Sequence, residues 1–594
     1  MSDLTPFKPY FLGPKSENEA WVRGQLQSVL DDWFDWRKSL FGDDPTVITG
    51  ADQAEPGFMR ERMLIRERLA ELVEQLRGEV PTYAPRYMGH MVSELALPAL
   101  LGHFAALLHN PNNSSKEASK VGTVIETEAV AMLAEMIGFD PRKARGHFTS
   151  GGTVANLEAV WRARYRMDHR LALALSLAED FGRPLDVFAA AHMSASRFRS
   201  LIAEFGIDDA AMRARSAVLG NPFAAAERIS RYSGRPYRGP VLIAPGHKHY
   251  SWVKAANVFG LGEEAFWTAP VDAEGRLCVS GLAERINEAR LLGRPVLMVV
   301  SVAGSTEMGE IDPVDAVAGH LAALRTREDL DIWHHVDAAY GGYFCALDPC
   351  EPLLAPARRR ALHAIRSADT VTIDPHKLGY APYACGTLLV RDAERDAISS
   401  FAAPYVERAD LGPAPWTTTL EGSRPATGAV ATWLVGKTLG FGPQGLGAVL
   451  RSTIESCRAV RAALSEGVPL LRPLDPTDTN IFCFSIADQG ETLSAANART
   501  AAVHAHIATS PDFSMSRTVL STLTCPDLID RHLDSYGGRR DADHLVLVRC
   551  VLMNPFWADE GVRARLLPEL VLELRRFVGA PAGAGRKHHS ISTA

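Results

Sequence analysis

The segment Ala368–Tyr383 reads Ala-Asp-Thr-Val-Thr-Ile-Asp-Pro-His-Lys-Leu-Gly-Tyr-Ala-Pro-Tyr and decides the expected fold. Val371 and Ile373 alternate with threonines, which is the period-two pattern of a buried strand. A proline ends this strand, so a histidine and Lys377 follow at its carboxyl end, where open α/β sheets bind ligands. Burial there would lower the pKa of the lysine amine, and a neutral amine can attack a carbonyl. A lysine in a surface turn is the alternative that this segment leaves open.

A second strand end carries a histidine. The strand-like run 241–245 precedes Gly246-His-Lys-His-Tyr-Ser-Trp, which places His249 between a strand and a helix. At that position a flat imidazole can stack on a ring cofactor, which contributes roughly 0.5–1.5 kcal/mol beyond burial of area. A histidine that only packs or caps locally fits the spacing equally well.

A third strand end carries a carboxylate. The apolar run 295–303 is typical of a strand inside a parallel sheet, and the next strand, 331–337, ends at Asp337 before two alanines. A buried aspartate needs a cation or several donors, and a protonated ring nitrogen supplies both. A metal site is not predicted, because no second carboxylate or histidine cluster accompanies it at a useful spacing.

A glycine pair supplies an anion site. In Gly146-His-Phe-Thr-Ser-Gly-Gly-Thr-Val-Ala-Asn-Leu-Glu158 the two glycines open directly into a helix, whose free N–H groups and positive dipole end suit a phosphate. Ser150, Thr153 and Asn156 can add side-chain donors. The spacing differs from both common nucleotide motifs. A phosphate cradle, a stacking histidine, a buried aspartate and a strand-end lysine together are what pyridoxal phosphate requires.

Composition places the chain among large soluble enzymes. Its 594 residues, 46% of them hydrophobic, predict more than one domain, and a net charge of −7 gives no basic stripe for nucleic acid. No long apolar run suggests a membrane span, and the start lacks the pattern of a signal peptide. Eight cysteines without paired spacing predict a reduced, cytoplasmic protein.

The chain divides into four predicted parts. Helical periodicity dominates residues 1–105, which we expect to take part in dimerisation, and a large cofactor-binding domain spans 106–430. A small C-terminal domain covers 431–578, with an irregular insert near 508–541, and a disordered tail covers 579–594.

Several motifs resemble the group II pyridoxal-phosphate-dependent amino-acid decarboxylases, and most of all the bacterial tyrosine decarboxylases. They are Thr372-Ile-Asp-Pro-His-Lys-Leu-Gly-Tyr-Ala-Pro-Tyr383, His335-Val-Asp-Ala-Ala-Tyr340, Lys248-His-Tyr-Ser-Trp252, the glycine-pair segment, Arg86-Tyr-Met-Gly-His-Met91, Asn110-Pro-Asn-Asn113 and Leu420-Glu-Gly-Ser423. The resemblance covers residues 80 to 570. It implies an α/β, fold-type I (aspartate aminotransferase-like) protein with a central, mostly parallel seven-stranded sheet, a helical N-terminal segment and a small α+β C-terminal domain. It also implies a homodimer with active sites at the subunit interface.

The same resemblance assigns roles to individual residues. Lys377 would form the Schiff base with the cofactor, His249 would stack on its ring, Asp337 would hold the ring nitrogen protonated, and Tyr383 would return a proton to the substrate carbon. Tyr383→Phe should then lower turnover by roughly 10²–10⁴. Further cofactor contacts are implied for Gly152, Thr153, Asn156, Ser305, Ala339, His376 and, from the second subunit, Ser423. His90 is a candidate substrate contact, and Arg549 either binds a substrate carboxylate or is a structural arginine.

The expected reaction is α-decarboxylation of an L-amino acid to an amine and carbon dioxide, with an aromatic, tyrosine-like substrate. Departures around Glu94 and the pair Ser119-Lys120 keep open an aspartate-like acidic substrate, free or carried on a partner protein. Two other classes stay as alternatives: a catalytically silent binding protein, and another pyridoxal-phosphate reaction that yields a carbonyl product.

Overall fold

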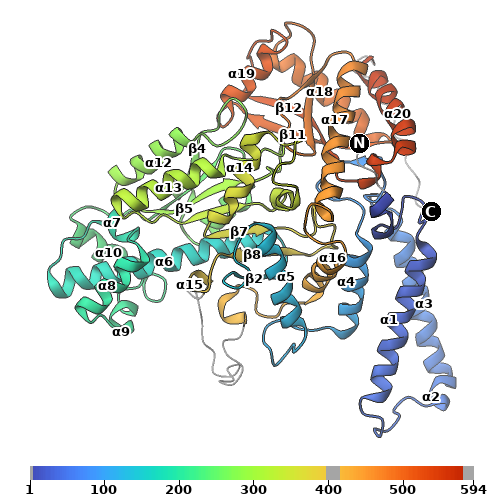
Figure 1. Cartoon of the computed structure of the whole chain (residues 1–594), viewed down its shortest axis with the longest axis horizontal. Coiled ribbons are helices and arrows are strands. Elements are labelled where there is room, and N and C mark those ends of the chain that lie inside the picture. The colour runs from blue at the N-terminus through green and yellow to red at the C-terminus, as the bar shows by residue number, and fades with distance from the viewer. Residues whose placement is uncertain (1–4, 397–414, 580–594) are drawn as a thin grey trace.

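A seven-stranded sheet lies at the centre of the computed structural model, which describes residues 5–396 and 415–579 (Figure 1). Its strand β8 is antiparallel to both neighbours, β2 and β7, and all other neighbouring strands are parallel. The predicted mostly parallel seven-stranded sheet is therefore confirmed. In spatial order the strands are β2 (Arg145–Thr149), β8 (Gly386–Val390), β7 (Thr370–Ile373), β6 (His334–Asp337), β5 (Val296–Val302), β3 (Val241–Pro245) and β4 (Phe266–Ala269).

Helices cover both faces of this sheet, which explains why its strands read as nearly continuous apolar runs. One face packs against α6 (Gly152–Phe181) and α11 (Ser251–Val258). The other face packs against α5 (Gly122–Met136), α12 (Val279–Leu291), α13 (Val314–Glu328) and α14 (Pro356–Ala364). The sheet is thus the middle layer of three, and only its edges and strand ends are open to ligands.

The parallel register brings distant residues to one edge of the sheet. Val302 at the end of β5 is paired with Asp337 at the end of β6, and Asp337 is paired with Thr372 of β7. The loops that leave these strands, and the turn that starts α6, meet at this carboxyl edge. This is the position at which α/β sheets bind their ligands.

A second, five-stranded sheet forms the small domain, in the order β1 (Tyr87–Met88), β11 (Ser514–Ser521), β12 (His544–Val551), β10 (Ile481–Ile486) and β9 (Leu471–Pro473). The expected irregular insert at 508–541 is wrong, since it contains β11 and α19 (Pro526–Asp534). Strand β11 carries serines, a threonine and an arginine among its apolar residues, and these polar residues hide it in the sequence. The predicted domain division stays a prediction, although β1 carries part of segment 1–105 into the small domain by pairing with β11.

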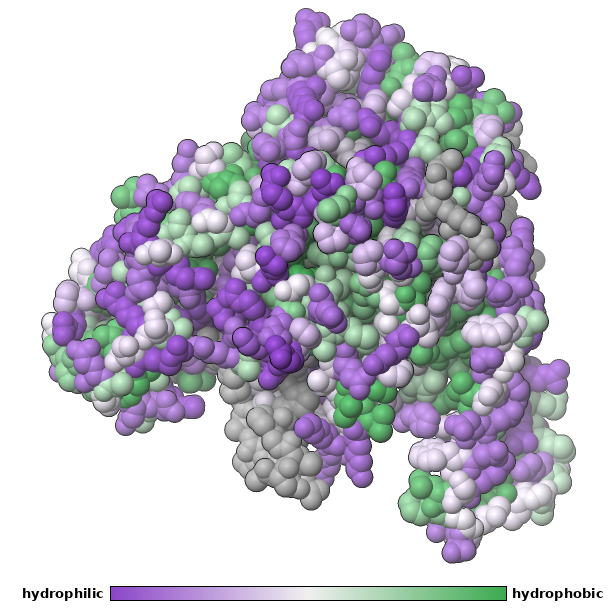
Figure 2. Space-filling view, in the orientation of Figure 1, coloured by the Kyte–Doolittle hydropathy of each residue, from purple (hydrophilic) through white to green (hydrophobic). Residues whose placement is uncertain are grey.

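Three N-terminal helices lie to the side of the body (Figure 1). They are α1 (Glu19–Ser39), α2 (Gly50–Ala54) and α3 (Pro56–Leu76), as the helical prediction for this segment expected. Apolar side chains lie among polar ones on this arm (Figure 2), because many of its large hydrophobic residues are exposed. Examples are Trp21, Met63, Ile65, Leu69 and Leu72.

Neither of the described ranges contains a helix with the length and apolar character of a membrane span. The eight cysteines are all free thiols. Within the same ranges no group of three or more histidine, cysteine or carboxylate side chains is arranged to hold a metal ion. The cytoplasmic location stays a prediction, and the predicted tail lies, from residue 580 onward, outside the described residues.

Candidate active site

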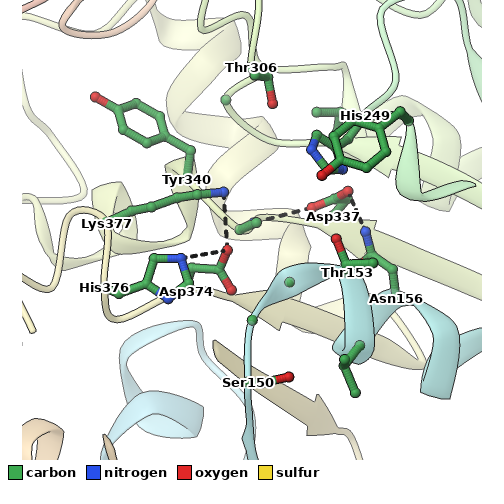
Figure 3. A pocket seen from close by; sticks show the side chains of 17 residues that line it. Ser150, Thr153, Asn156, His249, Thr306, Asp337, Tyr340, Asp374, His376 and Lys377 are labelled. Atoms are coloured by element: carbon green, nitrogen blue, oxygen red, sulfur yellow. Dashed lines mark hydrogen bonds and ion pairs between the residues drawn. The ribbon is translucent and has the colours of Figure 1, made fainter. Parts of the chain in front are cut away.

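A cavity of about 290 Å³ opens at the carboxyl edge of the seven-stranded sheet (Figure 3). Its lining comes from five places in the chain: the start of α6, the loop after β3, the loop after β5, the end of β6 and the end of β7. The lining includes Ser150, Gly151, Gly152, Thr153, Asn156, His249, Tyr250, Gly304, Thr306, Asp337, Ala339, Tyr340, Asp374, His376 and Lys377. Most of the residues predicted as cofactor contacts therefore share one cavity.

Lys377 reaches into the cavity from the turn that follows β7. Its Nζ lies 3.0 Å from Oδ2 of Asp374, and the same oxygen lies 3.5 Å from Nε2 of His376 (Figure 3). Asp374 is 2% exposed, and its second oxygen, Oδ1, is buried without a hydrogen-bond partner among the described residues. The lysine is thus held by a buried carboxylate three residues before it, on a turn fixed by the Lys377 N–H to Asp374 C=O hydrogen bond.

Asp337 is held by three N–H donors. Its Oδ2 accepts hydrogen bonds from Asn156 Nδ2 at 2.8 Å and from Trp252 Nε1 at 3.0 Å, and its Oδ1 accepts one from the Ala339 N–H at 3.3 Å. The side chain is 5% exposed and still lines the cavity. Since a carboxylate has about four acceptor positions, one of them is left for a donor inside the cavity.

Asn156 has a different task from the predicted one. Its amide nitrogen donates to Asp337 and to the Ser251 hydroxyl, and its Oδ1 accepts a hydrogen bond from Thr372 Oγ1 at 2.7 Å. Both amide hydrogens are therefore engaged. The side chain orients Asp337 instead of offering a free donor to a phosphate.

The turn at Gly151 and Gly152 starts α6 without a side-chain cap, so the first N–H groups of this helix have no partner within it. A side chain at position 152 would not fit, since a Cβ there would lie 2.8 Å from Asp374 Oδ2 and 3.3 Å from the Ala339 Cβ. The Ser150 N–H donates to Oε2 of Glu421 at 3.2 Å. Together with Thr153, this turn has the free N–H groups and hydroxyl that suit an anion.

Two histidines in the lining are neutral near pH 7. Burial lowers the pKa of His249, and the Lys377 charge adds to this effect against the opposing charge of Asp337. Burial likewise lowers the pKa of His376, although Asp374 acts in the other direction. The His249 Nδ1 lies 3.0 Å from the Ser251 hydroxyl, which fixes the ring at the wall of the cavity.

Three predicted contacts do not line the cavity. Ser305 is fully buried and donates its hydroxyl to the Glu310 carboxylate, while its neighbours Gly304 and Thr306 face the cavity instead. Ser423 is exposed and accepts a hydrogen bond from Asn112 Nδ2 at 3.1 Å. Tyr383 is 59% exposed, with its ring 4.3 Å from the His376 ring.

The two predicted substrate contacts lie together on the small-domain side. Arg549 sits in the middle of β12, paired with Ser516, and is 5% exposed. His90 follows β1 and is exposed, and its pKa is lowered by partial desolvation and by the charge of Arg549. That charge also acts on Tyr340, which lines the cavity. The pair therefore stands beside the cavity but outside its lining.

Sequence reasoning missed two residues of the site. In the sequence, Asp374 stands out only as the residue before the strand-ending proline, and Trp252 only as part of a motif. A carboxylate three residues before a strand-end lysine was a signal for the first. The second had no local signal, because the contact from Trp252 to Asp337 spans 85 positions in the sequence.

Comparison with known proteins agrees with this geometry. Residues 228–486 match the family described as "Pyridoxal-dependent decarboxylase conserved domain". The chain is 32% identical over 473 residues to the L-tyrosine decarboxylase of Levilactobacillus brevis, covering 75% of this chain and 73% of that protein. It is 30% identical over 378 residues to the aspartate 1-decarboxylase of Aliivibrio fischeri, covering 61% and 57%. The solved structure of Oryza sativa TDC with PLP and tryptamine shares the fold, with a TM-score of 0.61 at 18% identity over 93% of this chain and 97% of that one.

Proposed function

Since the chain belongs to the family of pyridoxal-dependent decarboxylases, we propose that it converts an aromatic, tyrosine-like L-amino acid into the corresponding amine and carbon dioxide. The carboxy-lyase class and the cofactor, pyridoxal phosphate, follow from the family. The observation that supports the chemistry best is the shared cavity in which Lys377, Asp337 and the open end of α6 meet. The aromatic substrate rests on the similarity to L-tyrosine decarboxylase.

The cavity fits pyridoxal phosphate by the chemistry of its donors. The uncapped start of α6 at Gly152 and Thr153 would hold the phosphate, and glycine is needed there because a Cβ would fill the space before Asp374 and Ala339. Asp337 would hold the ring nitrogen with its remaining acceptor position, and Lys377 would bind the aldehyde carbon. His249, His376 and Ala339 would complete the walls around the ring. When bound, the cofactor supplies an electron-withdrawing ring that stabilises the negative charge left on the substrate carbon.

The chain's own residues set up this chemistry. The Asp337 carboxylate keeps a positive charge on the ring nitrogen favourable, and the Asn156 and Trp252 donors hold that carboxylate in place. His249, whose pKa is lowered by burial, would line the ring side of the cavity without adding a competing charge. Tyr383 stays a prediction as the residue that returns a proton to the substrate carbon. Tyr383 is exposed and lies outside the lining, whereas His249 and Lys377 line the cavity. These two are therefore the competing candidates for this proton transfer.

The substrate end supports a second candidate. No carboxylate among the described residues forms an ion pair with the buried Arg549, whose Nη1 donates to Ser516 Oγ at 3.3 Å and whose Nε has no partner there. A buried, uncompensated guanidinium is costly unless a ligand supplies the anion. Such a residue can bind an α-carboxylate of any amino acid, or the side-chain carboxylate of an aspartate-like substrate, free or carried on a protein. The similarity to an aspartate 1-decarboxylase supports the latter.

We also propose that the active protein is a homodimer whose N-terminal arm packs on a second copy. The exposed apolar residues of α1 and α3, among them Met63 and Leu69, have no covering surface within the described chain. Ser423 would then reach the cofactor of the other subunit. Light scattering should give twice the chain mass, and a Met63→Glu, Leu69→Glu variant should shift the protein toward monomer.

Product analysis tests the proposed function. The protein, loaded with pyridoxal phosphate, is incubated separately with each of the twenty amino acids, with 3-methylaspartate and with carrier-bound aspartate, and the carbon dioxide and amine are measured. We expect tyramine from tyrosine in amounts equal to the carbon dioxide. An acidic substrate as the fastest would establish the alternative, a carbonyl product would indicate a different pyridoxal-phosphate reaction, and no product at all would indicate a silent relative.

A further inference from the structure

Asp374 stands between the two groups that the cofactor must reach. Its Oδ2 contacts Nζ of Lys377 at 3.0 Å, and the same oxygen would lie 2.8 Å from a Cβ at Gly152, so the carboxylate rests against the start of α6. Its Oδ1 is buried without a partner among the described residues. One carboxylate oxygen therefore contacts the amine and also lies beside the first turn of α6 (Figure 3).

The charges around Asp374 leave it a single cationic partner. The titratable groups that face it are Lys377, His376, His249, Tyr343, Tyr383 and Cys385. Burial lowers the pKa of both histidines, raises the pKa of Tyr343, and raises the pKa of Cys385 to about 12. Partial desolvation and the Asp374 charge raise the pKa of the more exposed Tyr383. These five groups are neutral near pH 7. Among the described residues, Lys377 alone balances the Asp374 charge.

This arrangement poses two electrostatic problems at once. An ammonium ion cannot bond to an aldehyde carbon, so Lys377 must first lose a proton. A phosphate at the start of α6 would meet the Asp374 carboxylate at close range, and two like charges in a buried site are strongly unfavourable. Transfer of one proton from the lysine to the aspartate removes both problems.

We propose that Asp374 accepts the proton that Lys377 gives up when pyridoxal phosphate is captured, and that the neutral carboxyl group then donates a hydrogen bond toward the phosphate. The proton leaves Nζ for Oδ2, which turns an ammonium and a carboxylate into an amine and a carboxylic acid. The Nζ lone pair then bonds to the aldehyde carbon, and the aldehyde oxygen leaves as water with the two remaining Nζ hydrogens. This inference rests on the proposed function, since it takes Lys377 as the residue that binds the aldehyde.

The test measures cofactor capture and the accompanying protons, independently of decarboxylation. Protein stripped of cofactor is mixed with pyridoxal phosphate in weak buffer, while the visible band follows attachment to the lysine and a pH indicator follows protons released to solvent. For Asp374→Asn we expect about one more proton released per cofactor bound than for the wild type. We also expect attachment roughly 10²-fold slower at pH 7 and accelerating with pH, because solvent must then take the proton.

Two further variants separate the possible failures. Glu421→Gln removes another carboxylate beside the same turn without touching Lys377, and it should release as many protons as the wild type. Asp374→Ser repeats the proton measurement with a side chain of a different shape, in case asparagine disturbs the turn. Circular dichroism checks the fold of each variant.

The outcomes are distinct. If Lys377→Ala still forms the visible band, the lysine is not the attachment point and the proposed function itself fails. If Lys377→Ala loses the band but both Asp374 variants match the wild type in proton release, Asp374 takes up no proton and this inference is overturned. If pyridoxal phosphate attaches to Asp374→Asn at an equal or higher rate than to the wild type, Asp374 is only a counter-ion of Lys377, and this inference is overturned as well.

Discussion

The two ends of the active-site region are built in different ways. The cofactor end lies at one edge of the seven-stranded sheet. Gly152 starts α6, Asp337 ends β6 and Lys377 follows β7, and all three line one cavity. At the substrate end, His90 follows a two-residue strand, and Arg549 lies in the middle of a strand of the other sheet. The first end is made by local motifs and parallel register. The second is made by pairing segments more than 400 residues apart.

This difference suggests that the cofactor end carries out the chemistry and that the substrate end selects the amino acid. At the cofactor end, Asp337 and Asp374 are already fixed by contacts within the chain, as groups that act on every substrate require. The substrate end has a buried guanidinium, that of Arg549, which contacts Ser516 but has no anionic partner among the described residues. We therefore expect substitutions at the cofactor end to lower kcat, and substitutions at the substrate end to change KM and the choice of amino acid.

Loss of the lysine should have the largest effect. Lys377→Ala removes the only group of the cavity proposed to bond to the cofactor, and kcat/KM should fall by at least roughly 10⁴-fold on any substrate. Stopped assays of carbon dioxide release from labelled tyrosine measure this. Lys254→Ala, on the exposed side of α11, is the matched control and should stay within about twofold of the wild type. A loss of kcat/KM in Lys254→Ala as large as that in Lys377→Ala would show that the effect does not depend on the position of the lysine in the cavity.

Asp337→Asn should have the second largest effect. The amide cannot hold a positive ring nitrogen, so kcat should fall by roughly 10²–10³-fold while Lys377 still attaches the cofactor. The visible band and single-turnover rates, recorded on the same sample, separate attachment from chemistry. The Asn156 and Trp252 donors both contact Oδ2 of Asp337, so both keep an acceptor when the amide oxygen of the variant takes that position. An unchanged single-turnover rate would show that Asp337 only fixes the loop.

The cofactor end was predictable because its signals are short. The strand around Val371 ends at a proline before Lys377, and the glycine pair opens directly into a helix, so each piece could be interpreted from about ten residues. Parallel register then brought the pieces to one edge, which the alternation of strands and helices already implied.

The rest could not be found in this way. Strand β11 pairs with β1, so the neighbours of Arg549 come from both ends of the chain. The Ser305 hydroxyl donates to the buried carboxylate of Glu310, five residues further on, and therefore does not face the cavity. No spacing rule predicts which residues of the loop 304–306 face the cavity. Side-chain pairing of this kind depends on packing, and packing is not encoded in periodicity.

Two buried arginines give the third prediction. Arg549→Met should raise KM for the true substrate roughly 10- to 100-fold, the value of a lost charged hydrogen bond, with little change in unfolding free energy. Arg424 is equally buried, but it pairs with Glu126 at 2.5 Å and donates to two backbone carbonyls. Arg424→Met should therefore cost about 3–5 kcal/mol of stability by stranding the Glu126 charge.

Steady-state kinetics and urea unfolding of both variants decide whether Arg549 is a binding or a structural residue. A binding role predicts a kinetic defect without a stability defect, the reverse of Arg424→Met. A stability loss in Arg549→Met as large as in Arg424→Met, with KM unchanged, would make it structural. If the KM increase is confined to acidic amino acids, the guanidinium binds a side-chain carboxylate, and the proposed aromatic substrate gives way to the alternative.

The smallest expected effect is a pKa change at His90. Partial desolvation and the Arg549 charge both lower the pKa of this exposed histidine from 6.5, so Arg549→Met should raise it. The unfolded chain binds a proton at His90 more readily than the folded chain does. The free energy of unfolding therefore decreases as pH falls below 6.5, and this decrease should be smaller in Arg549→Met. NMR titration of the histidine Cε1 protons, assigned with a His90→Gln variant, measures the shift. If the pKa of His90 does not change in Arg549→Met, the two residues are not coupled electrostatically, and the substrate end offers two independent contacts.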